Sequence, residues 1–410
     1  MLKIIFALIV LLISAVHPAN ASAPKLYFYP APYKLSDGSM MPSILAVSAE
    51  HLTTLFPEIK EMDGVVLMVS WAQLCPSLDH CDFSMIDQVL DYWHAKGKKV
   101  ILNLSTMGPP VKVIENGTAR FENETPDWVL KDINTYPAHT GTIGVIHGME
   151  VIKGVSHIDT IFPSVFDPRF VSYITGIVQA LGKKYDGNPT LSYVRISIGK
   201  VGEDHPLPPE GEGLLAYKKI PGFTVMNWIN YCKNITEIYQ NAFHKSQLEF
   251  DIGFLPAAYA KISNPGERAA TDQFMQYLND SHIFIAFNGL ESDEIDYWNA
   301  AGASDPRVSG SIEALHFLLQ AKSQGNHIGL EEHGPMTNPK MQDIPSLAKV
   351  INNVGPDRLV LFGLDAGVIN YAREGSNPAN AMTVRYMSKQ NKTIEEIGKL
   401  DQELLKLSGY

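Results

Sequence analysis

Residues 63–104 read DGVVLMVSWAQLCPSLDHCDFSMIDQVLDYWHAKGKKVILNL and contain one complete strand–helix–strand unit. The apolar, β-branched runs at 64–71 and 99–104 are typical of parallel strands that are buried on both faces. Between them, apolar side chains follow the i, i+3, i+4, i+7 spacing of one buried helix face: Ile86, Val89, Leu90 and Trp93. This stretch therefore predicts a parallel sheet covered by helices.

The same alternation continues along most of the 410 residues. Eight candidate strands alternate with helical stretches: Lys25–Tyr29, Gly64–Trp71, Lys99–Leu104, Tyr193–Gly199, Phe250–Leu255, Ile283–Phe287, His327–Glu332 and Leu359–Leu364. Eight such units favour a closed barrel. A doubly wound nucleotide-binding sheet would carry a glycine-rich turn after an early strand, whereas the second strand ends in SWAQLCP. We therefore predict a single (β/α)8 barrel over residues 24–410.

Two stretches are additional to the eight strand–helix units of a minimal barrel. Ser105 to about Pro163 forms a long, polar connection after the third strand, and long connections of this kind are usually lids or binding loops. Near the C-terminus, Thr393–Leu407 has the apolar spacing of an amphipathic helix, which we expect to close the barrel.

The first 23 residues have the composition of a secretory signal peptide. Lys3 precedes the apolar run Ile4–Val16, and Ala19-Asn20-Ala21 provides a small-x-small cleavage pattern. The run is shorter than the ~20 residues that span a bilayer, although an uncleaved anchor is the alternative. We expect a secreted or periplasmic protein with no membrane contact after cleavage.

Cysteine content and charge agree with export. Cys75 and Cys81 lie six positions apart in a loop-like stretch and can pair in an oxidising compartment, whereas Cys232 fits a buried thiol on an apolar helix face. The net charge of −11 argues against nucleic acid as a partner. No cofactor motif is present in the sequence, and we predict none.

Carboxylic acids follow two of the predicted strands. Barrel active sites are built at the C-terminal ends of the strands. The fourth strand leads into Glu203 and the seventh ends at Glu332, and these two strands face each other across a closed barrel. Glycoside hydrolysis needs such a pair, one group to protonate the departing oxygen and one to meet the positive charge at the sugar carbon.

Three stretches resemble the clan A glycoside hydrolases, above all their β-galactosidase-like members. The segment 63–104 is similar to the opening of those barrels, and FDPRFVSYITGIVQALGKKYDGNPTLSYVRISIG at 166–199 is similar to the approach to their acid/base strand. Glu332-His333-Gly334 is similar to the Glu-aromatic-Gly of their nucleophile strand. The likeness follows most of the mature chain in order.

The resemblance implies retaining hydrolysis of a β-linked oligo- or polysaccharide, with a carbohydrate as the only partner. Glu203 would be the general acid/base and Glu332 the nucleophile. Further side chains at the strand ends would line the sugar subsite: Trp71, Asn103, His205, Asn288 and His333.

Some positions depart from that family pattern. Gly202 stands where clan A enzymes usually have an asparagine before the acid/base, and Phe362-Gly-Leu-Asp365 replaces their tryptophan at the eighth strand end. The Gly-Glu arrangement is also somewhat like the inverting β-amylase-type barrels. Because alternation sends Glu331 and Glu332 to opposite sides of the strand, one should enter the cleft while the other forms a structural pair.

Two other functions fit the same residues. A secreted glycan-binding barrel without turnover is consistent with the departures at Gly202 and Asp365. A metal-assisted hydrolase would use as ligands Glu203, His205, Glu332 and His333, although no HExxH helix is present in the sequence.

Overall fold

The computed structural model describes the barrel strands and most of the surrounding helices. The described residues are 24–29, 33–34, 40–41, 62–108, 111–115, 118–141, 157–200, 202–206, 218–259, 262–290, 309–332, 344–361, 399, 402–403 and 406. The predicted signal peptide lies outside them, as does nearly all of the predicted closing helix at 393–407.

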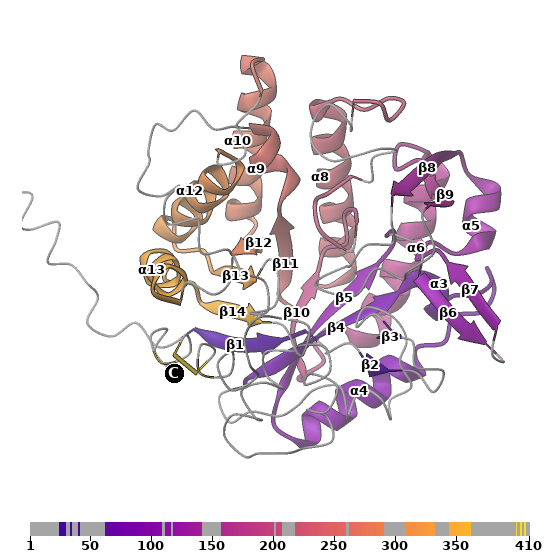
Figure 1. Cartoon of the computed structure of the whole chain (residues 1–410), viewed down its shortest axis with the longest axis horizontal. Helices are drawn as coiled ribbons and strands as arrows, with labels where there is room; N and C mark the ends of the chain where they lie inside the picture. Colours follow the sequence, from indigo (N-terminus) through magenta and orange to yellow (C-terminus); the bar gives the residue numbers. More distant parts are fainter. Residues whose placement is uncertain are drawn as a thin grey trace, which may run out of the picture.

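Eight parallel strands form a closed barrel, which confirms the predicted (β/α)8 architecture (Figure 1). Each strand pairs with the next barrel strand along the chain, and the last pairs with the first. In chain order the strands are β1 (Lys25–Phe28), β4 (Gly64–Ser70), β5 (Lys99–Ser105), β10 (Leu191–Arg195), β11 (Leu248–Ile252), β12 (Phe284–Leu290), β13 (Ile328–Glu332) and β14 (Arg358–Leu361).

Helices connect successive strands and cover the outside of the barrel. They are α3 (Trp71–Leu74), α4 (Ser84–Ala95), α6 (Pro168–Tyr185), α8 (Val225–Ala242), α9 (Phe254–Tyr259), α10 (Pro265–Asp280), α12 (Ser309–Ser323) and α13 (Ile344–Val354). None of the described helices is both long and apolar enough to cross a bilayer.

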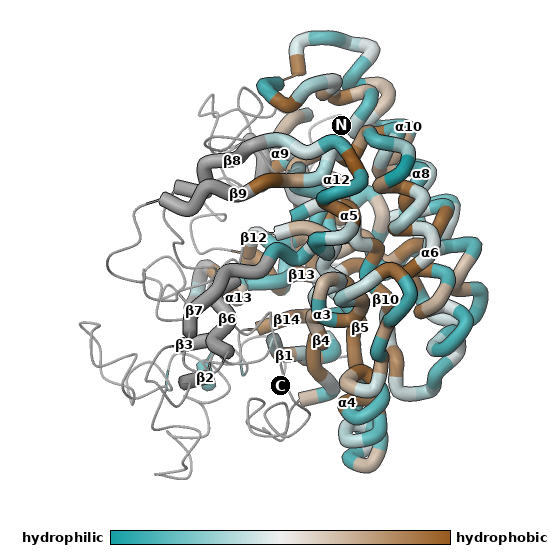
Figure 2. The backbone as a smooth tube through the Cα atoms, turned by 90° about the vertical axis from the view of Figure 1, so that its right-hand side faces the viewer, coloured by the Kyte–Doolittle hydropathy of each residue, from teal (hydrophilic) through white to brown (hydrophobic). Residues whose placement is uncertain are grey.

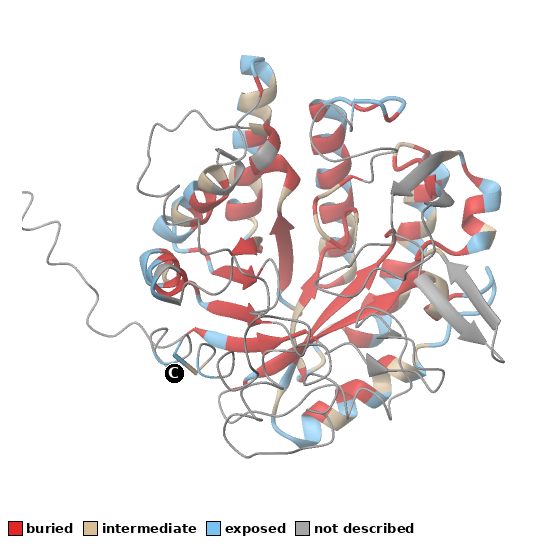
Figure 3. Cartoon of the chain, viewed as in Figure 1, coloured by how far each residue is buried: buried red, intermediate tan, exposed pale blue. Residues whose placement is uncertain are grey.

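The hydrophobic core has two layers. The larger layer lies between strands and helices, and its part under α4 consists of the four residues whose spacing predicted that helix face. A smaller layer fills the barrel interior and includes Tyr27, Met68 and Val360. The barrel strands are mostly buried (Figure 3), and β4 and β5 are mainly hydrophobic (Figure 2).

The long connection after β5 is folded, contrary to the expectation of a loop. It contains the hairpin of β6 (Val111–Glu115) and β7 (Thr118–Glu122), the helix α5 (Asp127–Asp132), and the hairpin of β8 (Thr135–Gly141) and β9 (His157–Pro163). Both hairpins stand at the same side of the barrel (Figure 1). The described part of this connection therefore adds two hairpins and a short helix at one side of the barrel.

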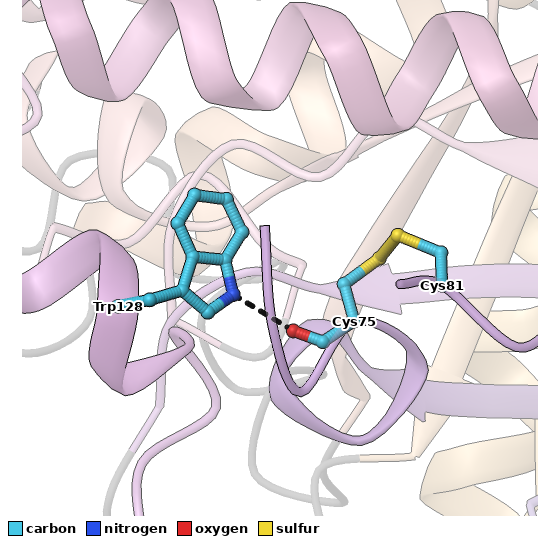
Figure 4. The surroundings of a disulfide bond; sticks show 3 residues. All are labelled: Cys75, Cys81 and Trp128. Atoms are coloured by element: carbon cyan, nitrogen blue, oxygen red, sulfur yellow. Dashed lines mark hydrogen bonds between the residues drawn. A yellow bond between two sulfur atoms is a disulfide. The ribbon is translucent and has the colours of Figure 1, made fainter. Parts of the chain in front are cut away.

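The predicted disulfide Cys75–Cys81 is present, with its sulfur atoms 2.04 Å apart. The Trp128 indole N–H on α5 donates a hydrogen bond to the Cys75 carbonyl over 2.9 Å (Figure 4). The disulfide loop thus holds α5 against the start of the barrel wall. Cys232 is a buried free thiol, as predicted.

Candidate active site

A tight turn after β10 carries Glu203. The Gly199 N–H donates to the Glu203 carbonyl over 2.8 Å and closes the turn. Gly202 has φ +90°, a left-handed conformation that favours glycine, and a side chain there would also collide with the Asn103 amide. The backbone therefore requires glycine before Glu203, which accounts for the departure from the asparagine of the family pattern.

Asp204 anchors this turn to the following strand connection. Its carboxyl group accepts three consecutive backbone N–H groups, from Gly253 (2.5 Å), Phe254 (2.6 Å) and Leu255 (3.0 Å). The Asp204 side chain is fully buried. Three hydrogen bonds to one buried side chain restrict the turn, so this anchor fixes the position of the neighbouring Glu203.

Glu203 lies in a nearly closed environment, with 14% of its side chain exposed. The Asn288 amide donates a hydrogen bond to its Oε1, and His205 Nε2 lies 4.0 Å from its Oε2. Burial raises the pKa of Glu203 to about 7, while the positive charge of Lys200 and the Asn288 hydrogen bond oppose the rise. A carboxyl group with such a pKa can hold a proton near neutral pH and donate it.

Asn288 links Glu203 to the end of β13. The side chain of Asn288 contacts Glu203, and its Cα lies in register with that of Glu331 on the neighbouring strand. After a register shift, Leu290 pairs with Glu332. The proposed acid and the two β13 glutamates thus lie at the same end of the barrel.

The two β13 glutamates are both fully buried, but they differ in position. Glu331 Oε1 accepts hydrogen bonds from Arg195 and from Arg358 (2.8 Å), and its Oε2 accepts the Tyr29 hydroxyl at 2.6 Å. Both of its carboxyl oxygens are therefore engaged in the barrel interior. We expected one of these two glutamates to form a structural pair, and Glu331 does so with the arginines. Glu332 is the last residue of β13.

An ionic cluster fills the interior beneath the mouth. Arg195 Nε donates to Glu249 Oε1 over 2.8 Å, and its Nη1 lies 3.2 Å from Asp251 Oδ2. Arg358 also bonds Glu249. Burial would raise the pKa of Glu249, but the two guanidinium groups hold it below its usual value. The pKa of Asp251 is raised by burial and by the neighbouring Glu331.

Carboxyl groups outnumber guanidinium groups in this cluster. Arg195 and Arg358 pair with Glu249, Asp251 and Glu331. Glu203 stands next to the cluster: the charge of Glu331 raises its pKa, whereas the charges of Lys200 and Arg195 lower it. Burial is therefore the main cause of the raised pKa of Glu203.

The other predicted sugar-binding residues lie in different surroundings. Trp71 is 1% exposed and packs edge-on against Trp128 at a ring distance of 6.1 Å, so it belongs to the core and offers no face to a sugar. Asn103 is fully buried beneath Gly202, and the His205 side chain is 33% exposed beside Glu203. His333 and Asp365 lie outside the described residues.

Among the described residues, no group of three or more histidine, cysteine, aspartate or glutamate side chains could hold a metal ion. His333, which the metal hypothesis also needs, is not among them.

Sequence reasoning missed several charged residues of the site. Arg195 lies inside the run YVRISIG, where an arginine at an inward position of an apolar strand was a usable signal. Glu124 is fully buried and accepts a hydrogen bond from Ser105 at the end of β5; burial raises its pKa to about 7. No local pattern around Glu124 indicated this position.

One protein family is similar to part of the chain. Residues 57–127 match the model of glycoside hydrolase family 42, described as β-galactosidase. No curated protein matches the sequence.

Solved structures with a similar chain trace include three xylanases. XynB from Paenibacillus barcinonensis shares 11% identity, over 87% of this chain and 92% of that chain, with a TM-score of 0.42. Xylanase10C from Cellvibrio japonicus, in complex with xylopentaose, shares 9% identity over 94% of this chain and 68% of that chain, with a TM-score of 0.46. A GH10 xylanase from Thermobacillus composti shares 11% identity over 94% of this chain and 97% of that chain, with a TM-score of 0.42.

The family match spans the end of the approach to β4, then β4, α4, β5 and the first hairpin, and the strand pairing independently closes a (β/α)8 barrel. The stretch 57–127 is thus similar to this glycoside hydrolase family, and the closed barrel gives the fold of the whole described chain.

Proposed function

We propose that the protein hydrolyses β-linked oligo- or polysaccharides with retention of configuration. Glu203 serves as the general acid/base and Glu332 as the nucleophile. In the first step a Glu332 oxygen bonds to the anomeric carbon while the Glu203 proton moves to the departing oxygen. In the second step Glu203 takes a proton from water, the water oxygen bonds to the anomeric carbon, and Glu332 is released.

The environment of Glu203 carries this proposal. A general acid must be protonated at the working pH and must stand at the mouth of the barrel, and Glu203 follows β10 with a pKa raised by burial to about 7. Asp204 fixes its turn, and Asn288 orients its carboxyl group. These features give the acid a defined position, as proton transfer to a bound sugar requires.

Glu331 is a second candidate for the nucleophile. It also lies at the end of β13, and its charge is among the causes that raise the pKa of Glu203. We favour Glu332 because both Glu331 oxygens already accept hydrogen bonds from the cluster. Glu332 instead occupies the last position of β13, at the C-terminal end of the barrel.

Separate Gln substitutions test the proposal on a panel of 4-nitrophenyl β-glycosides and β-linked oligosaccharides. Glu203→Gln should lower kcat by about 10²- to 10⁴-fold, since general acid/base catalysis contributes about that much. Glu332→Gln should abolish turnover, and both variants should still bind the product sugar. Glu237→Gln on the exposed side of α8 is the matched control and should behave like the wild type.

Small anions distinguish the two roles. Azide can fill the space left by a shortened carboxylate, so Glu332→Ala should regain turnover and release an α-glycosyl azide. Glu203→Ala should instead release a β-glycosyl azide. Wild-type protein that binds glycans but turns over no substrate of the panel would support the binding-protein alternative and refute the proposed function.

A further inference from the structure

A cavity of about 220 Å³ lies beside the turn that carries Glu203. Its described lining is apolar except for Lys219, and four aromatic rings contribute to it: Tyr136, Phe162, Phe166 and Phe223. The Tyr136 hydroxyl group donates a hydrogen bond to Ser164 Oγ over 3.0 Å. The phenol therefore offers the cavity mainly its ring.

The cavity lies on the side of the proposed acid. Pro206 lines it and stands three residues after Glu203, so the two Cα atoms are at most about 11 Å apart. Met107 also lines it and forms a β-bridge with Lys200 in the same turn. No described lining residue comes from β12, β13 or β14. Since the acid must reach the departing oxygen, this is the side on which the leaving group lies.

The chemistry of the lining favours an apolar ring over a sugar. Each hydroxyl group that loses water without gaining a hydrogen bond costs free energy, and the described lining provides few polar partners. Aromatic walls instead stabilise a flat apolar group through burial and ring contacts. An apolar cavity of about 150 Å³ holds a benzene molecule, so this cavity has room for a somewhat larger ring.

We propose that this cavity binds the leaving group of the substrate and selects an aglycone with an apolar ring, of the benzyl or aryl alcohol class, over a second sugar. The inference rests on the proposed function and narrows it, because it fixes the chemistry of the group that Glu203 protonates. The folded connection after β5 supplies much of the selecting surface, through Tyr136 and Phe162.

The test compares benzyl and methyl β-glycosides of whichever sugar the enzyme accepts. Both leaving groups are simple alkyl alcohols of similar basicity, so a difference in kcat/KM reports recognition of the ring. Wild-type protein should favour the benzyl glycoside by about 10- to 100-fold, the range expected for burial of a large apolar group. A disaccharide of the same sugar should be the poorer substrate.

Phe166→Ala removes one wall and should reduce the benzyl-to-methyl ratio about tenfold, while Phe166→Leu should retain most of it. Tyr92→Ala, a half-buried aromatic position on α4, is the matched control and should leave the ratio unchanged. Equal rates on the two glycosides, an unchanged ratio in Phe166→Ala, or faster cleavage of the disaccharide would overturn the inference and leave the glycosidase function intact. Hydrolysis of none of the β-glycosides would instead refute the proposed function, and the inference with it.

Discussion

Glu203→Gln should stabilise the folded protein at pH 8 although it removes activity. Burial raises the pKa of Glu203 from 4.5 to about 7. A carboxyl group with a raised pKa favours the folded state fully below pH 4.5, and this contribution is lost as the pH rises through 7, because ionisation is easier in the unfolded chain. Glutamine keeps the shape and the Asn288 contact but does not ionise.

The expected gain follows from the size of the shift. Each unit of pKa difference between the folded and unfolded states corresponds to about 1.4 kcal/mol. A rise from 4.5 to about 7 therefore lowers the free energy of unfolding of the wild type by about 3 kcal/mol at pH 8. At pH 4 both side chains are neutral, and the two proteins should have nearly equal free energies of unfolding. Burial also raises the pKa values of Asp204 and Glu124 to about 7, but both residues are present in both proteins, so their effect cancels.

Urea denaturation at pH 4 and pH 8 measures this difference. We expect the midpoint of Glu203→Gln to exceed that of the wild type at pH 8 only, with an unchanged m-value. The exposed Glu237→Gln should show no such pH-dependent gain. A Glu203→Gln protein that is less stable at pH 8, or equally shifted at both pH values, would refute the reasoning that burial holds this carboxyl group protonated.

Four further outcomes follow from the same contacts. The kcat/KM should fall as the pH rises through about 7, because Glu203 must carry a proton to act as the acid; a flat profile from pH 6 to 9 would contradict this. Asp204→Ala leaves three backbone N–H groups without their acceptor and should lower kcat about 10²-fold through misplacement of the acid; an unchanged kcat would show that the anchor does not position it. Arg195→Met should cost about 3–5 kcal/mol in urea denaturation, since it leaves buried carboxylates without their cation, and a near-neutral effect would contradict the ionic cluster. Replacing Cys75 and Cys81 by serine should lower the free energy of unfolding by about 2 kcal/mol, because the disulfide no longer closes a short loop in the unfolded chain. A much larger loss would contradict this entropic account and indicate lost packing of α5.

Periodicity predicted the barrel but not all of its boundaries. The helix face of α4 and the eight strands follow directly from apolar spacing, because the strand–helix interface is where most side chains are buried. The run Gly64–Trp71 reads as one strand, yet β4 ends at Ser70 and Trp71 opens α3 within the outer core. Hydrophobicity alone does not distinguish a strand end from a buried helix start.

The candidate site was predictable only in part. Strand ends located Glu203, and alternation indicated that one of the two β13 glutamates would form a structural pair. The pairing of Glu331 with Arg195 across the barrel was not predictable, since it depends on which side chains meet in the interior. The need for Gly202 follows from its backbone conformation and its contact with Asn103, which no linear pattern encodes.

Chemical trapping tests the two-carboxylate mechanism most directly. A 2-deoxy-2-fluoro β-glycoside with a good leaving group slows both steps and lets a covalent glycosyl-enzyme accumulate if the second carboxylate is a nucleophile. Digestion and tandem mass spectrometry then locate the attached sugar. We predict one sugar per chain, on Glu332. A label on Glu331 or on any other residue, or turnover of β-glycosides with no adduct at all, would contradict the assignment.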